Sequence, residues 1–309
     1  MSSEVLALER LGPGDVAGGL ALSDAAGWNQ SADDWSFFIA AGAAFGMRLD
    51  RSTLVATAAA LPYDAATGWI SMVLVAAAQR HRGIASQLVD ACVASLRDSG
   101  RTPVLDATPA GAAVYAKIGF AAGFAFERWE GRVARHELGN AGDEAARDER
   151  GNAGEVARHE RGSVGAQNEA RSIVAAAPDA EILIDLDRRA GGVDRTPLWR
   201  AFLARPETRA WLAPRGDGFA LRRAGRRATQ IGPVVATDAA IAIDLVGAAL
   251  ADVAGPVFID VPVDCTEVAS ELARRGFMRQ RSFVRMALGD ARAAAARDAV
   301  FALAGPEFG

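Results

Sequence analysis

The sequence predicts an α/β (α+β) protein made of two related halves, and three observations lead to this expectation. Strand-like and helical patterns alternate along the first 131 residues, a charged, glycine-rich segment follows, and the remaining residues repeat several motifs of the first part more weakly. A chain of 309 residues is long enough for two domains that each bury a core. We therefore expect a first domain at 1–131, a flexible low-complexity linker at 132–172 and a second domain at 173–309.

Composition excludes several classes of function. The formal charge of −4 gives no general attraction to nucleic acid or to an anionic membrane surface. No run approaches the roughly 18 apolar residues that a membrane span needs, and no signal peptide is evident, so we expect a cytoplasmic protein. The two cysteines, Cys92 and Cys265, lie too far apart to indicate a disulfide framework or a metal site.

The elements of the first half follow from local patterns. Asp15 is a candidate cap for the helix after the turn at 12–14, and residues 28–30 read as a loop that enters the helix near Trp35. Apolar residues from Ala85 to Leu96 recur at helical spacing, and Gly100 is a natural stop for that helix. Strands are expected at 5–8, 54–59, 69–75 and 104–105.

The helix that contains Ala85–Leu96 begins at a turn with an unusual composition. The apolar run that ends at Val75 leads into Arg80-His-Arg-Gly83, and the helix starts immediately after it. The first turn of a helix exposes unpaired N–H groups and carries the positive end of the dipole, so it binds phosphate well. After the next strand, Thr108-Pro109 caps a short helix that carries Tyr115, four residues before Gly119-Phe120. An anion-binding turn beside a phenol predicts chemistry on a phosphate-bearing cofactor.

Residues 132–172 differ from the rest of the chain. They contain three imperfect copies of a charged repeat, which begin at Arg135, Arg147 and Arg158. Such a segment cannot bury enough apolar surface to offset its ordering entropy, which favours a linker, with a partner-binding segment as the alternative. Two of the three histidines, His136 and His159, belong to these copies, so we expect no metal site.

The second half repeats the scaffold without the chemistry. Strands are expected at Ile182–Leu186, Ala228–Ala236 and Val257–Val261, and Ile259-Asp260 resembles Leu105-Asp106. However, Thr237–Ala240 replaces the Arg- and Gly-bearing turn, and Leu272 stands where a counterpart of Tyr115 would be.

These motifs together resemble the GNAT N-acyltransferase superfamily. The pattern Gln/Arg-x-x-Gly-x-Gly/Ala that holds the pyrophosphate of acetyl-CoA in that family is matched by Arg80–Ala85, and Tyr-x-x-x-Gly-Phe is matched by Tyr115–Phe120. The whole chain resembles tandem members that append a degenerate acyltransferase-like domain, and its tail, Ala304–Phe308, matches that second part. The resemblance implies two domains, each with a mixed, mostly antiparallel twisted sheet flanked by helices.

The resemblance also implies roles for residues. Acetyl-CoA is the expected co-substrate, with no metal, and the residues expected to bind it are Leu74, Val75, Arg80, His81, Arg82, Gly83, Ile84, Ala85 and Ser86. Tyr115 is the expected general acid, because a phenol stays protonated at neutral pH and can supply a proton to the departing thiolate. Asp106, at a strand end, is one candidate for the base that deprotonates the amine, and a chain of water molecules is an equal alternative. The other interpretation of Asp106 is a carboxylate that stabilises a cap or a loop. Thr108 departs from the asparagine found in many members, so we expect it to act mainly as a helix cap.

The resemblance also indicates where the acceptor amine would bind. Trp28, Asn29 and Trp35 lie where the family builds its acceptor wall, although packing in the core would explain both tryptophans equally well. We expect an N-acetyltransferase that acts on a small-molecule amine by direct transfer, as a monomer or homodimer. The alternatives are a non-catalytic acyl-CoA sensor or scaffold and a protein N-acetyltransferase.

Overall fold

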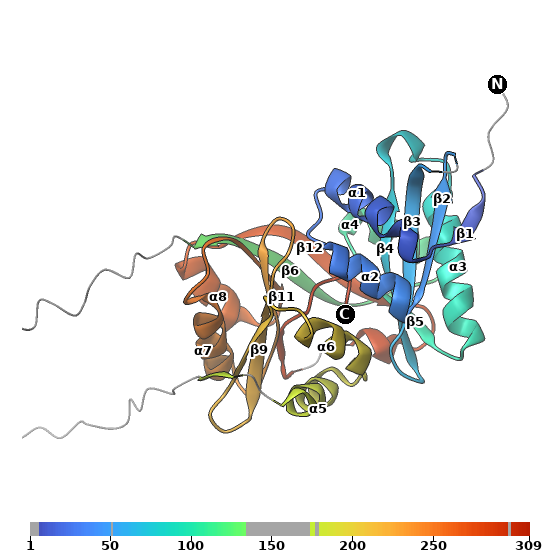
Figure 1. Ribbon diagram of the computed structural model, residues 1–309. Coiled ribbons are helices and arrows are strands. Elements are labelled where there is room, and N and C mark those ends of the chain that lie inside the picture. The colour runs from blue at the N-terminus through green and yellow to red at the C-terminus, as the bar shows by residue number, and fades with distance from the viewer. Residues whose placement is uncertain (1–5, 51, 134–173, 177–178, 296–297) are drawn as a thin grey trace, which may run out of the picture.

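The computed structural model describes residues 6–50, 52–133, 174–176, 179–295 and 298–309 (Figure 1). Nearly all of the expected linker, with its three repeats, lies outside the described residues. In the described part of the chain no helix is long and apolar enough to cross a membrane.

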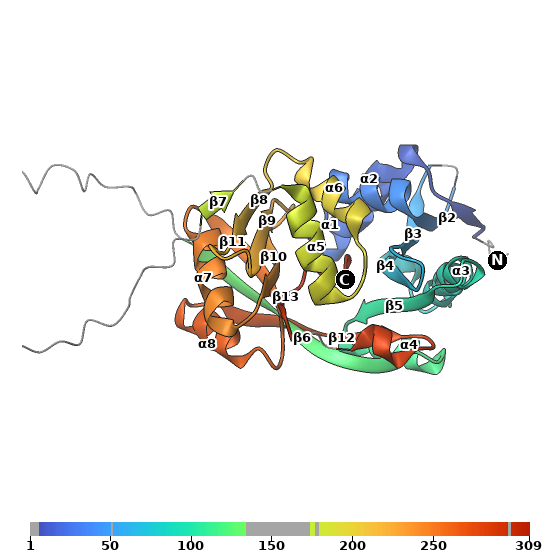
Figure 2. The same ribbon diagram turned by 90° about the horizontal axis from the view of Figure 1, so that it is seen from below.

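The first half places helices on both faces of a twisted sheet (Figure 2). A capping box starts α2, since Ser31 Oγ accepts from the Asp34 N–H and Asp34 accepts from the Ser31 N–H. The expected cap at Thr108 is confirmed, because its hydroxyl accepts from the Gly111 N–H at 3.3 Å. The elements are β1 (Leu8–Arg10), α1 (Val16–Ala26), α2 (Ala32–Ala41), β2 (Ala43–Arg48), β3 (Leu54–Pro62), β4 (Thr67–Val75), α3 (Ile84–Asp98), β5 (Thr102–Ala107), α4 (Pro109–Lys117) and β6 (Ala121–Val133).

The second half repeats this order, with one correction to the sequence reading. Residues Ile182–Leu186 were expected to form a strand but lie in the helix α5, which Asp179 caps by accepting from the Glu181 N–H. Asp185 also pairs with arginines one turn later along that helix, which favours it over a strand. The elements are β7 (Val174–Ala176), α5 (Ala180–Gly191), α6 (Thr196–Leu203), β8 (Arg209–Leu212), β9 (Gly218–Arg223), β10 (Thr229–Ala236), α7 (Ala239–Leu250), β11 (Gly255–Pro262), α8 (Thr266–Arg274), β12 (Met278–Ala287) and β13 (Val300–Ala302).

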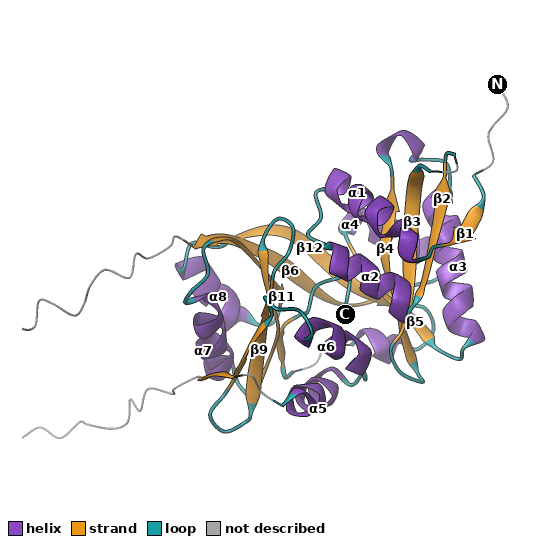
Figure 3. Ribbon diagram, viewed as in Figure 1, coloured by secondary structure: helices purple, strands orange, loops and turns teal. Residues whose placement is uncertain are grey.

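The two halves exchange one long strand each and so form a single continuous sheet (Figure 3). The strand order is β1-β2-β3-β4-β5-β12-β6-β11-β10-β9-β8-β7, so β12 of the second half lies between β5 and β6 of the first. In return β6 pairs along its length with β11 of the second half. Both exchanged strands are antiparallel to their neighbours, and the sheet is mixed and mostly antiparallel, as expected.

Two buried ion pairs mark the exchange and are related by its approximate two-fold symmetry. Arg285 of β12 makes two hydrogen bonds of 2.9 Å to Asp106 of β5. Arg128 of β6 makes two of 2.8 Å to Asp260 of β11. In both pairs the arginine lies directly opposite the aspartate in the strand register, so each exchanged strand satisfies a carboxylate of the other half.

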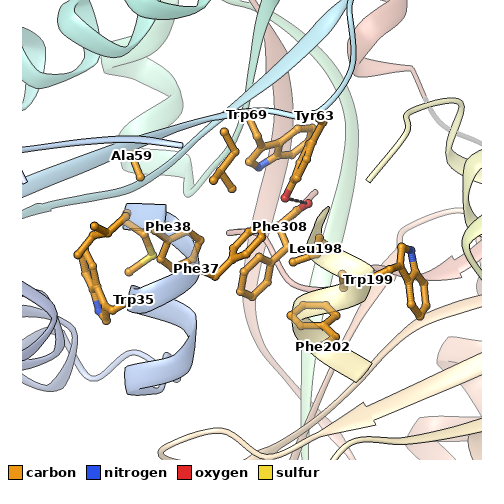
Figure 4. Packing of buried hydrophobic residues seen from close by; sticks show 14 of the residues in the cluster. Trp35, Phe37, Phe38, Ala59, Tyr63, Trp69, Leu198, Trp199, Phe202 and Phe308 are labelled. Atoms are coloured by element: carbon orange, nitrogen blue, oxygen red, sulfur yellow. Dashed lines mark hydrogen bonds between the residues drawn. The ribbon is translucent and has the colours of Figure 1, made fainter. Parts of the chain in front are cut away.

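The last residues of the described chain are buried between the two halves (Figure 4). Phe308 has no exposed surface, stacks on Phe38 of α2 and meets Phe202 of α6 edge to face. Its carbonyl oxygen accepts from the Tyr63 hydroxyl at 2.9 Å. The aromatic core is therefore shared by both halves and closed by the C-terminal residues.

Candidate active site

The strands β4 and β5 separate in the middle of the first half. Their parallel pairing runs from Thr67 with Thr102 to Trp69 with Val104 and ends there. Just beyond that point β4 carries an extra residue relative to β3, and Met72 adopts a left-handed φ of 53°. A positive φ at a residue other than glycine is uncommon, so the backbone is locally reshaped where the strands part.

A cavity of about 140 Å³ lies where the two strands diverge. Its inner wall is formed by Ile70–Val73 of β4, by Leu105–Thr108 at the end of β5, and by Gly111 and Tyr115 of α4. The opposite wall comes from the second half and from the exchanged strand β6. It consists of Arg128, Phe258, Gln280, Arg281, Phe283, Pro306 and Glu307. Neither half alone therefore encloses this space, which we call the β4–β5 cavity.

The corresponding divergence in the second half is filled by the chain itself. The parallel pairing of β10 with β11 ends at Ile231 and Ile259. There β13 inserts and pairs with β10, and the Leu303 N–H donates to the Asp260 carbonyl oxygen on β11 at 2.9 Å. A strand thus occupies the space that is a cavity in the first half.

The turn before α3 leaves the start of that helix open to an anion. Gly83 caps the helix in a left-handed conformation with φ of 76°, which only glycine adopts without strain. No side chain of the described chain caps α3, and its first turn contains no acidic residue. Arg80 ties the exposed turn to β4 by donating to the Val75 carbonyl oxygen at 3.2 Å. Such an N-terminus binds phosphate through its N–H groups and its dipole.

The matching helix of the second half is closed in the same place. Asp238 caps α7, and its carboxylate accepts from the Ile241 N–H at 2.9 Å. A carboxylate on the helix axis already satisfies the dipole and would repel a phosphate. The second half thus lacks the Arg- and Gly-bearing turn, and the N-terminus of its helix α7 is already occupied by the carboxylate of Asp238.

Tyr115 lies in the wall of the β4–β5 cavity. Its ring packs against Phe120 with the ring centroids 6.0 Å apart, and a Cβ atom on Gly111 would stand 3.2 Å from it. Burial raises the pKa of the Tyr115 phenol to about 12, and Cys92 adds to the rise. The phenol is therefore protonated at neutral pH and available as a proton donor.

Asp106 lines the same cavity, but its carboxylate is not free. The side chain has no exposed surface, and Arg285 holds both carboxylate oxygens. Burial raises the pKa of Asp106, while the charge and hydrogen bonds of Arg285 oppose that rise. This geometry fits a structural anchor between the halves better than the general base that the sequence suggested.

The three residues expected in the acceptor wall separate in the structure. Trp28 lines the cavity. Asn29 lines it as well, but its Oδ1 atom accepts hydrogen bonds from the Arg227 and Ala228 N–H groups. Asn29 therefore also stabilises a loop of the second half. Trp35 corrects the expectation, because it has no exposed surface, donates to Ser23 Oγ at 2.9 Å and does not line the cavity.

The sequence reading assigned no role to Glu307, which faces the β4–β5 cavity from the C-terminal tail. Its side chain is buried, and its carboxylate forms no ion pair within the described part of the chain. Burial raises the pKa of Glu307, and the charges of Arg223 and Arg128 partly oppose the rise. The only signal in the sequence was the tail Ala304–Phe308, which matched the family pattern without indicating which cavity it enters.

Comparison with known families gives two matches. A model described as the acetyltransferase (GNAT) family matches residues 21–120, and a model described as an acetyltransferase (GNAT) domain matches residues 183–302. The two ranges do not overlap and together span more than half of the chain. No curated protein matches this chain in sequence.

Several solved structures share the fold. A putative acetyltransferase from Pyrococcus horikoshii superposes with a TM-score of 0.76 at 18% identity, and the alignment covers 100% of this chain and 98% of that one. A tandem GNAT protein from the clavulanic acid biosynthesis pathway gives 0.59 at 18% identity, with 92% and 98% covered. A GCN5-related N-acetyltransferase from Sphaerobacter thermophilus gives 0.57 at 15% identity, with 91% and 95% covered. At these identities the likeness concerns the fold alone.

Proposed function

Because the chain belongs to the GNAT acetyltransferase family, with one domain of that family in each half, we propose that its first half transfers an acetyl group from acetyl-CoA to the amine of a small molecule. One observation carries the assignment to the first half. The divergence of β4 and β5 is open, and β4 leads to α3, which no side chain of the described chain caps, whereas the matching divergence in the second half is filled by β13.

The binding of acetyl-CoA is assigned to the turn and to the end of β4. The diphosphate would be held by the backbone N–H groups of the first turn of α3, which belong to Ile84, Ala85 and Ser86. The side chains of Arg80 and Arg82 would assist. His81 shares this exposed turn, with a positive φ of 62°. From the turn, Val75 and Leu74 lead back along β4 to the irregular backbone at Met72. The pantetheine chain would follow this edge and present its thioester to the β4–β5 cavity.

The reaction forms one bond and breaks another. The amine nitrogen attacks the carbonyl carbon of the thioester, and negative charge gathers on the carbonyl oxygen. Backbone N–H groups of the reshaped segment around Val73 are suited to stabilise this charge, because donors fixed in advance act strongly in a dry site. The carbon–sulfur bond then breaks, and the sulfur leaves as a thiolate that takes a proton from the Tyr115 phenol. The nitrogen becomes positively charged when its new bond forms, and the second proton that it releases to give the amide restores the phenol.

Before it attacks, the amine must lose a proton, and Glu307 is the group we assign to receive it. A free ammonium group has a pKa near 10.4, so at neutral pH it needs a base in reach. Asp106 is held by Arg285, whereas Glu307 lines the cavity without an ion pair in the described chain. Because burial raises the pKa of Glu307, its carboxylate is a stronger base than an exposed one.

A thiol-release assay with acetyl-CoA over a panel of small amines tests the proposal. We expect Tyr115→Phe to lower kcat by about 100-fold or more, since general acid catalysis contributes roughly 10²- to 10⁴-fold, with CoA affinity nearly unchanged. We expect Glu307→Gln to lower kcat similarly and to remove the rise of the rate with pH that deprotonation of a carboxylate produces.

Tyr63→Phe is the matched control, because Tyr63 is the only other tyrosine and its hydroxyl bonds to the Phe308 carbonyl oxygen outside the cavity. This variant should transfer acetyl groups at nearly the wild-type rate. Full activity of Tyr115→Phe would remove Tyr115 from its role. Binding of CoA without turnover of any amine or peptide would favour a sensor, and turnover of peptides alone would favour a protein acetyltransferase.

A further inference from the structure

The β4–β5 cavity is lined by an arginine that forms no ion pair within the described chain. Arg281 lines the cavity from β12 and lies directly opposite Arg128 in the pairing of β12 with β6. Like charges at opposite positions in neighbouring strands repel. The nearby carboxylate of Asp260 is already occupied, since Arg128 holds both of its oxygens and Gln230 donates to one of them.

Arg281 itself makes no hydrogen bond or ion pair with any residue that the structure describes. Arg281 is exposed as a whole, although part of it lines the cavity. Partial burial and the charge of Arg128 lower the pKa of Arg281, and the charge of Asp260 opposes this shift. An anion bound beside Arg281 would offset the repulsion from Arg128. The planar guanidinium group matches the two oxygens of a carboxylate particularly well.

The opposite charge and two unsatisfied acceptors lie in the same cavity. Glu307 contributes a carboxylate without an ion pair in the described chain. Gln30 and Ser71 also line the cavity, and their buried Oε1 and Oγ atoms have no hydrogen-bond partner among the residues that the structure describes. Buried polar atoms are nearly always paired in folded proteins, so these two point to a ligand that donates hydrogen bonds. An ammonium or amine group has this property.

We infer that the acceptor carries an acid group as well as its amine, with the amine facing Glu307 and Gln30 and the acid group held by Arg281. This inference rests on the proposed acetyl transfer and specifies its substrate class as amino acids and compounds of similar charge. The volume of about 140 Å³ is below the roughly 300–1,000 Å³ of sites for drug-sized ligands, which agrees with a small acceptor.

The test compares acceptors that differ only in the acid group. Amino acids are paired with the amines that lack their α-carboxylate, and phosphoethanolamine is paired with ethanolamine to separate a carboxylate from a phosphate. We expect kcat/KM to favour the carboxylate-bearing member of each pair by about 10- to 100-fold, because a charge-assisted hydrogen bond contributes that much. A preference confined to the phosphate would overturn the amino-acid assignment.

Arg281→Gln should abolish this preference by raising KM for the acids, while the rate with the amines changes less than about threefold. Arg279→Gln is the matched control, since Arg279 lies on the same strand, is exposed and pairs with Glu127. Equal kcat/KM for acids and amines in the wild type, or a preference that survives Arg281→Gln, would refute the inference. Calorimetric titration of the CoA-bound protein with the same pairs separates the two proposals, because equal binding of acids and amines refutes this one even without turnover.

Discussion

The buried pair of Asp106 and Arg285 can be tested as an anchor between the halves by replacing its members singly and together. Leucine and methionine are suitable replacements, since they remove the charges and keep apolar volume. In Asp106→Leu the guanidinium of Arg285 stays in a site where the side chain is only 12% exposed. Breaking a buried pair in this way costs about 3–5 kcal/mol of the free energy of unfolding.

The surroundings of each partner refine this magnitude. Arg285 keeps aromatic faces near its charge, with its guanidinium carbon 4.4 Å from the ring centre of Trp69 and 4.8 Å from that of Phe124. Such contacts stabilise a cation by about 0.5–2 kcal/mol, so Asp106→Leu should fall near the lower end, about 3 kcal/mol. Arg285→Met leaves a fully buried carboxylate and should cost nearer 5 kcal/mol at neutral pH. This cost should shrink in acid, where Asp106 can take up a proton.

The double variant should recover most of the loss, because replacing a buried ion pair by apolar residues is often neutral or stabilising. Urea unfolding followed by tryptophan fluorescence measures the free energy of unfolding of all three variants. Glu127→Gln, which breaks the surface pair of Glu127 with Arg279, is the control and should lower this free energy by less than about 1 kcal/mol. The acetyl-transfer rate of the folded double variant decides the chemistry. A rate within several-fold of the wild type fits an anchor, whereas a folded, inactive double variant would return Asp106 to the role of base. A cost below about 1 kcal/mol for Asp106→Leu would refute the anchor itself.

Two further predictions concern the cofactor turn and the phenol. Arg82→Glu places a negative charge where the diphosphate of CoA is expected, so it should weaken CoA binding about 10- to 100-fold by calorimetry. Arg97→Glu, at the other end of α3, is the control and should leave CoA affinity unchanged. Equal CoA affinities of the two variants would refute the placement of the turn. In Tyr63→Phe, absorbance at high pH reports Tyr115 alone. Because burial disfavours the phenolate, its titration midpoint should be about 12 in the folded protein and near 10 in urea. A folded midpoint near 10 would mean that the ring is solvated.

Local signals in the sequence predicted much of the first half. Capping residues, glycines at helix ends and apolar periodicity each depend on a few neighbouring residues, so Thr108 and Gly100 could be interpreted without knowledge of the fold. The same reasoning failed at Ile182–Leu186, a short run rich in isoleucine and leucine. Its length does not distinguish a buried strand from a buried helix. In α5 the buried residues Leu183, Ile184, Asp187 and Ala190 recur at helical spacing, a pattern that extends beyond the short run itself.

The exchange of β6 and β12 could not be predicted, because the pairing joins residues more than a hundred positions apart. Nothing in the local pattern of Phe283–Met286 distinguishes pairing with its own half from pairing with β5. The acceptor wall depends on this exchange, which is why the sequence identified Trp28 but not Arg281 or Glu307. The expectation for Trp35 was wrong for a related reason. The spacing of an aromatic residue along a helix is the same whether its side chain faces a cavity or the core, so the sequence could not distinguish the two.

The C-terminal segment connects the loss of one site with the completion of the other. Residues 300–302 form β13 and fill the divergence of β10 and β11, so the second half lacks the open divergence to which we assign cofactor binding in the first half. Only five residues after β13, Glu307 lines the β4–β5 cavity, a distance that a short extended segment spans easily. The Trp69 indole N–H donates to the Pro306 carbonyl oxygen, and Phe308 stacks on Phe38, so the segment on either side of Glu307 is held in place. A chain that closes one divergence in this way delivers its next carboxylate to the other, so a second half whose own divergence is filled still contributes six of the residues that line the β4–β5 cavity.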